Sequence, residues 1–179
     1  VSCASMACQR RECANVGVPR ALAITKLDAG RGDFDSVLSE CQSAFGDGVL
    51  PLAIPQLGAG GSLDATVDLV LGEVHDYTGS ERVVKKTGPE HQEFFETYQG
   101  PLLEGIIQEA EDDTLLDRYL EGEEIGFEVV EDALLKAVAR GSFFPVLPMS
   151  VATGAGVDVL LHLIEKAFPP PTLHPLPRV

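Results

Sequence analysis

The chain has 179 residues, of which 45% are hydrophobic, and a formal net charge of −15. This length can bury the core of one domain, or of one domain and a smaller one. The mean hydropathy of +0.11, and the lack of a long apolar run or of a charged and then apolar leader, favour a soluble protein without membrane contact or targeting. The acidic charge argues against direct, sequence-specific binding of nucleic acid, which needs clustered lysine and arginine. Most of this charge is expected to keep the surface solvated, although it would also suit a basic protein partner.

The cysteines and histidines are spaced in a way that argues against a metal site. Cys3, Cys8 and Cys13 are five residues apart and Cys41 stands alone, so no paired Cys-x-x-Cys zinc pattern occurs. The four histidines share no ligand spacing either. We therefore expect reduced thiols, no bound metal and a cytoplasmic protein.

The first predicted unit is a strand followed by a helix. Residues 20–25 form a short apolar run between Pro19 and a polar turn, which is typical of a buried parallel strand. The next segment predicts a helix that Asp33 caps and Gly46 ends. One face of this helix is apolar and carries Phe34, Val37, Leu38, Cys41 and Phe45.

Short strands are predicted next. Residues 49–55 indicate a second strand, and the glycine-rich residues 58–61 indicate a turn. Residues 62–77 predict an antiparallel strand, and residues 82–86 a strand at the edge of a sheet. The alternating apolar positions of the antiparallel strand are Ala65, Val67, Leu69 and Leu71.

In the second half of the chain the apolar period becomes helical. Residues 90–113 predict two helices or one broken helix, because Pro101 lacks the N–H that a helix interior requires. Two further amphipathic helices are predicted within residues 113–122 and 127–141, and a buried strand within 142–150. The last predicted helix ends at three prolines and has an apolar face of Val157, Leu160, Leu161, Ile164 and Phe168.

This order of elements predicts an α/β sheet that carries an inserted α/β subdomain, because two strand–helix units bracket a segment of mixed strands and helices. The sheet is expected to form from residues 16–53 and 141–170, and the insert from residues 54–140. Residues 1–15 are expected to be a divergent or truncated start. The proline-rich residues 171–179 are expected to link the chain to a following domain.

The turn Thr25-Lys26-Leu27-Asp28 follows the first predicted strand, at the edge where loops of a parallel sheet meet ligands. An aspartate there can accept hydrogen bonds from N1–H and the 2-amino group of guanine, whereas adenine would leave the carboxylate unpaired. The stem of Lys26 can lie along the base while its ammonium stays in water, and Thr25 can hold the turn. Four residues alone favour the alternative, an ordinary surface turn in which Asp28 starts a helix.

A second loop follows the predicted strand at residues 142–150. It begins with Ser150 and Val151 and leads through a glycine turn into a helix. A backbone N–H in such a loop could donate to the O6 atom of guanine, so that two loops would hold one base from two sides. The alternative is that Ser150 only caps the helix.

Several segments in collinear order carry a resemblance to a known family. These segments are VGVPRALAITKLD, VLPLAIPQ with DATVDLV, LLEGIIQEAEDDTLLDRYLEGEEI and PVLPMSVATGAGVDVLLHLIEKAFPPP. From about Val16 to Pro177 the chain resembles the second half of the GTPase domain of elongation factor G and its relatives. The family usually has Asn in place of Thr25 and Gly-Ser-Ala in place of Met149-Ser150-Val151, which favours an elongation-factor-G-like paralogue.

The resemblance implies a cytoplasmic, ribosome-dependent translational GTPase that binds GTP or GDP, with Mg²⁺ in the complete parent protein. It implies that Lys26, Asp28 and Ser150 bind the guanine base, with Thr25 and Val151 in support. It also implies that the acidic insert docks on the ribosome, through the ribosomal stalk protein.

The phosphate-binding motif of such proteins does not occur in the sequence. No G-x-x-x-x-G-K-[ST] is present, and the glycine-rich residues 58–62 lack its lysine. Asp76-Tyr77-Thr78-Gly79 has the D-x-x-G form of a magnesium loop, but it follows the base-recognising turn instead of preceding it. No histidine can be assigned to the catalytic position of the family. We therefore expect the C-terminal part of a P-loop-type GTPase sheet, a fragment that lacks the phosphate-loop half and is inactive alone.

Two other functions fit the same residues. An acidic protein-docking module would use the insert and bind no nucleotide. A fragment of a peptide-release-factor-type translational GTPase would share the base-recognising turn and differ in the ribosomal step. Nucleotide binding would separate the first of these from a GTPase, and the residues beyond the chain would separate the second from an elongation-factor-G-like protein.

Overall fold

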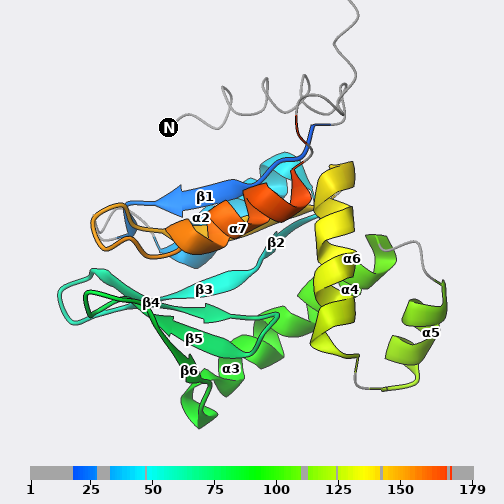
Figure 1. The fold of residues 1–179 in the computed structure, drawn as a ribbon, viewed down its shortest axis with the longest axis horizontal. Helices are drawn as coiled ribbons and strands as arrows, with labels where there is room; N and C mark the ends of the chain where they lie inside the picture. Colours follow the sequence, from blue (N-terminus) through cyan, green and yellow to red (C-terminus); the bar gives the residue numbers. More distant parts are fainter. Residues whose placement is uncertain are drawn as a thin grey trace, which may run out of the picture.

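Two sheets with helices packed beside them make up the described part of the chain (Figure 1). The computed structural model describes residues 18–27, 33–46, 48–109, 113–123, 125–141, 143–168 and 170. One sheet has three parallel strands in the order β1-β7-β2, and the other has four antiparallel strands in the order β3-β4-β5-β6. The predicted mixed α/β class is therefore confirmed. The predicted segments 1–15 and 171–179 lie outside the described residues.

The parallel sheet is centred on β7 (Phe144–Met149), which pairs with β1 (Leu22–Thr25) on one side and β2 (Val49–Pro51) on the other. From its second residue onward β7 is buried, as expected for a parallel strand covered on both faces. In Figure 1, α7 (Val157–Ala167) lies in front of this sheet and α2 (Phe34–Phe45) behind it. The strand predicted at residues 20–25 and the strand predicted at residues 142–150 are both confirmed.

Helix α2 forms as its sequence predicts. The Asp33 carboxylate accepts a hydrogen bond from the Ser36 amide at 2.7 Å, which caps the first turn and lowers the pKa of Asp33. At the other end the Gly46 amide donates to the Gln42 carbonyl at 2.8 Å. The residues that α2 buries are Phe34, Leu38, Cys41 and Phe45. Cys41 is buried and forms no disulfide, and the three earlier cysteines lie outside the described residues.

The strand predicted over residues 49–55 is two strands in two different sheets. β2 ends at Pro51 and β3 (Ala53–Leu57) begins the antiparallel sheet. Leu52 joins them, because its amide donates to the Val146 carbonyl in β7 and its carbonyl accepts from the Leu69 amide, both at 3.0 Å. A continuous apolar run cannot reveal this change of sheet, since both sheets bury it.

The antiparallel sheet is a meander of four short strands. β3 is followed by β4 (Leu63–Asp68), β5 (Glu73–Asp76) and the exposed edge strand β6 (Val83–Lys86). The single strand predicted within residues 62–77 is therefore a hairpin. Its turn forms because the Asp68 carboxylate accepts hydrogen bonds from the amides of the next turn, at 2.8 Å from Val70 and 2.7 Å from Leu71. The predicted edge strand is confirmed as β6.

A continuous helical stretch replaces the break that was predicted at Pro101. It consists of the 3₁₀ turn η2 (Pro89–His91), α3 (Gln92–Phe94), the π-helical η3 (Phe95–Gln99) and α4 (Gly100–Glu109). The π-helical segment ends two residues before Pro101, which has no N–H to donate into the turn before it. The wider turn therefore accommodates the proline within the helix.

The remaining helices are α5 (Asp113–Leu120) and α6 (Phe127–Arg140), followed after β7 by α7. The predicted apolar face of α7 is partly wrong, since Leu161 is 60% exposed and Ile164 is 43% exposed. Helix α7 buries Leu163 and Ala167 instead, because apolar residues occupy most of its circumference and packing selects a different stripe. In the described part of the chain, every helix is too short or too polar to cross a membrane.

Candidate functional site

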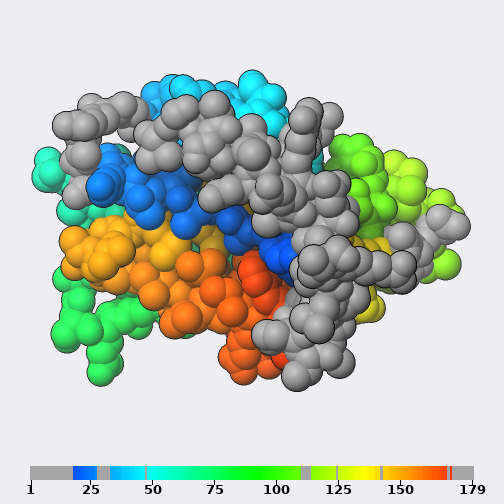
Figure 2. Space-filling view, turned by 90° about the horizontal axis from the view of Figure 1, so that it is seen from above, coloured from blue at the N-terminus to red at the C-terminus, as the bar shows by residue number. Residues whose placement is uncertain are grey.

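Two loops meet at the carboxyl edge of the parallel sheet. Thr25, the last residue of β1, pairs with Met149, the last residue of β7. Because the strands are parallel and neighbouring, Lys26 and Ser150 each begin a loop at the same edge. Figure 2 shows the segment that holds β1, in blue, beside the segment that follows β7, in orange. The predicted site residues on these two loops therefore lie on neighbouring strand ends.

The turn after β1 has an unusual backbone. Lys26 has a φ of 62°, the one positive φ of a non-glycine residue in the described part of the chain. Such a conformation is uncommon outside glycine and asparagine, and it persists where the surroundings determine it. Leu27 provides that constraint, because its side chain is only 8% exposed while Thr25 and Lys26 are exposed. The predicted base-binding Asp28 lies outside the described residues.

The loop after β7 is closed by its own hydrogen bonds. The Ser150 amide donates to the Ala155 carbonyl at 3.1 Å, and the Ser150 hydroxyl accepts from the Thr153 amide at 3.3 Å. Gly156 has a φ of 74°, and a Cβ atom there would lie 2.3 Å from the carbonyl oxygen of Pro148. Only glycine fits this close approach, so Gly156 sets the shape of the loop.

The tip of this loop presents unused backbone donors. Among the described residues, the amides of Val151 and Ala152 make no hydrogen bond, whereas the Ser150 amide is engaged. Val151 is 85% exposed. An acceptor such as a carbonyl oxygen would therefore find free N–H groups at Val151 and Ala152.

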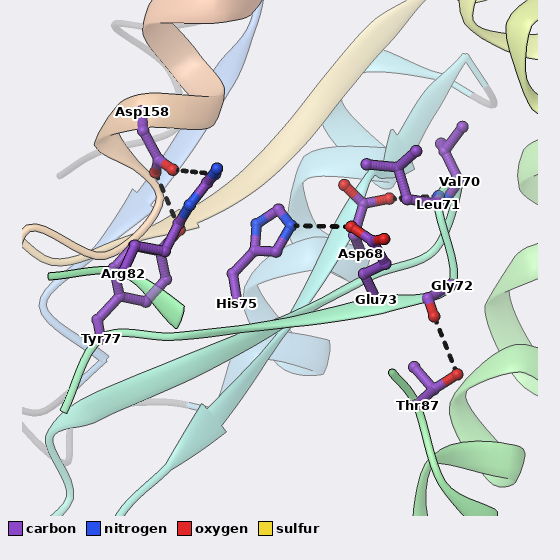
Figure 3. Close-up of polar contacts among 10 residues, drawn as sticks. All are labelled: Asp68, Val70, Leu71, Gly72, Glu73, His75, Tyr77, Arg82, Thr87 and Asp158. Carbon is purple, nitrogen blue, oxygen red and sulfur yellow. Dashed lines mark hydrogen bonds and ion pairs between the residues drawn. The ribbon is translucent and has the colours of Figure 1, made fainter. Parts of the chain in front are cut away.

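Three side-chain contacts tie this loop and the first turn of α7 to the antiparallel sheet and the residues that follow β5. The Thr153 hydroxyl donates to the Leu63 carbonyl at 3.0 Å. The Tyr77 hydroxyl donates to the Asp158 carboxylate at 2.9 Å, and the Arg82 guanidinium bonds the other oxygen of Asp158 at 2.5 Å (Figure 3). Burial and the neighbouring carboxylate both raise the pKa of Tyr77. The only sequence signal for these contacts is the acidic residue Asp158 in the first turn of α7. No feature of the sequence predicts Tyr77 as its partner.

The D-x-x-G segment at residues 76–79 has a structural use. The Asp76 carboxylate accepts from both the amide and the hydroxyl of Thr78 and forms an ion pair with Lys85. These partners, Lys85 first, hold the pKa of Asp76 below its usual range. Within the described ranges, no three His, Cys, Asp or Glu side chains gather as they would around a metal ion.

A second candidate region is the acidic segment from Glu104 to Glu124, whose described part contains the end of α4 and all of α5. It contains nine acidic residues and one basic residue, Arg118. Arg118 is itself paired with Glu123 at 2.8 Å. Figure 1 shows α5 at the far side of the helices from both sheets, and its described residues Thr114, Asp117, Arg118 and Leu120 are exposed.

These features define a mixed α/β protein with two strand-end loops at one edge of a parallel sheet, the place where such sheets bind ligands. The chain is homologous to a segment of the elongation factor G-like proteins, as its sequence predicts. It is 44% identical over 169 residues to the elongation factor G-like protein of Mycobacterium tuberculosis. It is 30% identical over 146 residues to the elongation factor G-like protein of Thermotoga maritima.

The similarity extends to a solved structure. A crystal structure of a protein from Thermus thermophilus superposes with a TM-score of 0.74 and 35% identity, over 89% of this chain and 23% of that one. The two sequence matches cover 94% and 82% of this chain. The chain spans only 23% and 20% of the length of these two curated relatives. No family model matches the sequence.

Proposed function

We propose that this chain is the guanine-recognising part of the GTP-binding domain in an elongation-factor-G-like, ribosome-associated translational GTPase of the cytoplasm. The observation that supports this most is the pairing of Thr25 with Met149, because it brings the two predicted base-binding loops to one sheet edge. The similarity to two elongation factor G-like proteins supports the general kind of activity.

Each loop has a distinct role in this proposal. The Asp28 carboxylate accepts hydrogen bonds from guanine N1–H and the 2-amino group, and the stem of Lys26 lies along the base. The free amides at Val151 and its neighbour donate to guanine O6, which gives Val151 a role through its backbone. Ser150 holds this loop in shape through its hydroxyl and amide, and Thr25 supports the turn.

The chain's own contribution is therefore to the base of GTP or GDP. The phosphates and Mg²⁺ are assigned to other segments of the longer protein, since the sequence contains no phosphate-loop motif. In this arrangement residues 16–53 and 141–170 belong to a P-loop-type GTPase sheet, and residues 54–140 form the inserted subdomain. Leu52, which bonds both sheets, marks the passage from one to the other.

A replacement experiment tests the proposal. The corresponding segment of the Mycobacterium tuberculosis relative would be exchanged for this chain, and binding of fluorescent GDP would be titrated. We expect the hybrid to bind GDP and to reject ADP, because adenine leaves Asp28 without a partner. A hybrid that folds, binds neither nucleotide and yet retains its other partners would contradict guanine recognition and favour the acidic docking module.

The density of acid in the sequence from Glu104 to Glu124 favours a second role, docking of the insert on the ribosome through a basic region of the stalk protein. Opposite charges speed the encounter of two proteins, and exposed charges act over roughly 8–10 Å at physiological salt. Surface plasmon resonance of the chain on purified stalk protein at low and high salt tests this role. A peptide-release-factor-type GTPase remains the alternative parent, which an assay of elongation against peptide release by the longer protein would separate.

A further inference from the structure

A groove of about 450 Å³ runs between the antiparallel sheet and helices α6 and α7. We call it the β5–α6 groove. One wall comes from β4, β5 and β6, and the other comes from one face each of α6 and α7. It lies away from the turn after β1, and α4 and α5 contribute nothing to its lining. Neither of the two proposed functions uses it.

The rim of this groove exposes large apolar side chains. Leu71 is 39% exposed, Val84 44% and Phe127 39%, and all three line the groove. Further buried apolar residues, among them Leu134 and Leu163, form its floor. Scattered apolar residues on a surface are ordinary, but a contiguous set around a concave surface is typical of a binding site.

The same groove carries carboxylates that lack a permanent positive partner. Among the described residues no lysine or arginine pairs with Asp68, Glu73 or Glu131. The basic side chains beside Glu73 and Glu131 are histidines: His75 lies 3.9 Å from Glu73, and His162 lies 3.2 Å from Glu131. Arg82 also lines the groove, but Asp158 holds its guanidinium (Figure 3). At neutral pH the groove is therefore negatively charged.

Two polar groups in this wall are shielded from water: Asp68 is half-buried and His75 is buried. Burial raises the pKa of Asp68, although its turn supplies two amide donors. The His75 side chain is only 5% exposed, and its Nδ1 atom has no hydrogen-bond partner. Figure 3 shows His75 directed toward Asp68 and Glu73. A positive charge placed outside this wall would stabilise its carboxylates.

We propose that the β5–α6 groove binds an amphipathic peptide segment of a partner protein, with apolar side chains against Leu71, Val84 and Phe127 and a lysine or arginine against Glu131 and Glu73. Apolar burial supplies the affinity of such an arrangement, and charge supplies its selectivity. A polyanion or an acidic peptide is excluded by the same carboxylates.

Selection from a displayed library of random helical peptides on the purified chain tests this proposal. We expect the enriched peptides to combine apolar residues at helical spacing with at least one lysine or arginine. Fluorescence anisotropy of one labelled, enriched peptide should then show affinity about tenfold lower for Phe127→Ser and for Glu131→Lys. Matched variants on the same helix outside the groove, Val129→Ser and Glu128→Lys, should bind as the wild type does.

Circular dichroism must first show that each variant keeps the wild-type fold, so that a loss of peptide binding can be assigned to the exchanged side chain. Enrichment of nothing, enrichment of peptides without basic residues, or equal loss in the matched variants would overturn the proposal. Analytical ultracentrifugation of the chain alone measures whether the chain self-associates. Self-association that Phe127→Ser abolishes would assign the groove to a second copy of the chain and would also overturn it.

Discussion

Thr25 and Met149 are directly paired in parallel register, and each is the last residue of its strand. This pairing decides the geometry of the candidate site, because the chain leaves the sheet at both positions toward the same edge. One exit carries the strained Lys26 turn, and the other carries the loop whose shape Gly156 sets. Two segments more than a hundred residues apart in the sequence thus leave the sheet at one edge.

Exchange of Asp28 for Asn tests the base contact in the hybrid protein described above. The variant loses one charged acceptor and places an amide against guanine, so GTP affinity should fall roughly tenfold or more, about 1–3 kcal/mol. XTP should recover affinity relative to GTP, because xanthine has a carbonyl in place of the 2-amino group. Isothermal titration with both nucleotides measures the two changes, and unchanged GTP binding would discard the role of Asp28.

Exchange of Gly156 for Ala tests the shape of the second loop. The new Cβ would meet the Pro148 carbonyl at 2.3 Å and would also force a residue with a side chain to a φ of 74°. We expect the free energy of unfolding to fall by at least about 2 kcal/mol in urea titrations. Gly154→Ala is the control, since φ is 76° there but nothing lies within 4 Å of a Cβ atom. Its cost should be near 1 kcal/mol, and equal costs would contradict the close approach.

The strand ends of the candidate site were predictable because each follows a short apolar run at a polar turn. The way in which the loop after β7 is held was not predictable. Thr153 reaches Leu63 and Asp158 reaches Tyr77 across the two sheets, and such distant partners leave no periodic trace in a sequence. The change of sheet at Leu52 was missed for a related reason, since both sheets bury the same apolar run.

Local signals predicted helix α2 better than helix α7. Asp33 and Gly46 mark the ends of α2, and its one apolar face leaves no choice of packing. Helix α7 has apolar residues around most of its circumference, so tertiary contacts selected Leu163 and Ala167 over Leu161 and Ile164. A helix that is apolar on all sides specifies burial but not the buried stripe.

Exchange of Asp68 for Asn tests the electrostatics of the groove wall. Burial raises the folded-state pKa of Asp68 above its usual 3.8. Between that value and the folded pKa the folded state binds the proton more tightly, so stability is lost as pH rises through this window. The Asn variant keeps an oxygen for the Val70 and Leu71 amides and carries no charge. Its stability relative to the wild type should therefore be greater at about pH 7 than at about pH 3.5.

Urea unfolding of both proteins across this pH range measures the difference. The control is Asp68→Ala, which also removes the carboxyl group and should therefore show the same pH dependence relative to the wild type. It should be about 1–3 kcal/mol less stable than the Asn variant at every pH, because two amides lose their acceptor. The stability difference between the Asn variant and the wild type could also prove constant with pH. That result would show that the charged Asp68 carboxylate does not destabilise the folded protein.

Charge reversal in the acidic segment from Glu104 to Glu124 tests the docking role of the insert. Exchange of Glu109, Glu111 and Asp112 for Lys should lower the rate of association with a basic stalk protein. Added salt should also lower this rate for the wild type. The control exchanges three acids elsewhere, Glu40, Glu128 and Glu165, for Lys, which alters the net charge equally. Identical association rates for both triple variants at low and high salt would contradict docking through α4 and α5.

The last prediction is that this chain alone does not hydrolyse GTP. Phosphoryl transfer depends on amides, a lysine and Mg²⁺ placed around the γ-phosphate, and the sequence contains no phosphate-loop motif to supply them. Base contacts alone would contribute about 4 kcal/mol, which corresponds to a dissociation constant near 1 mM. Phosphate release from GTP should therefore equal the buffer rate, with and without ribosomes, while the hybrid protein serves as the positive control. Magnesium-dependent turnover by the chain that Asp28→Asn abolishes would mean that a phosphate site exists among its own residues.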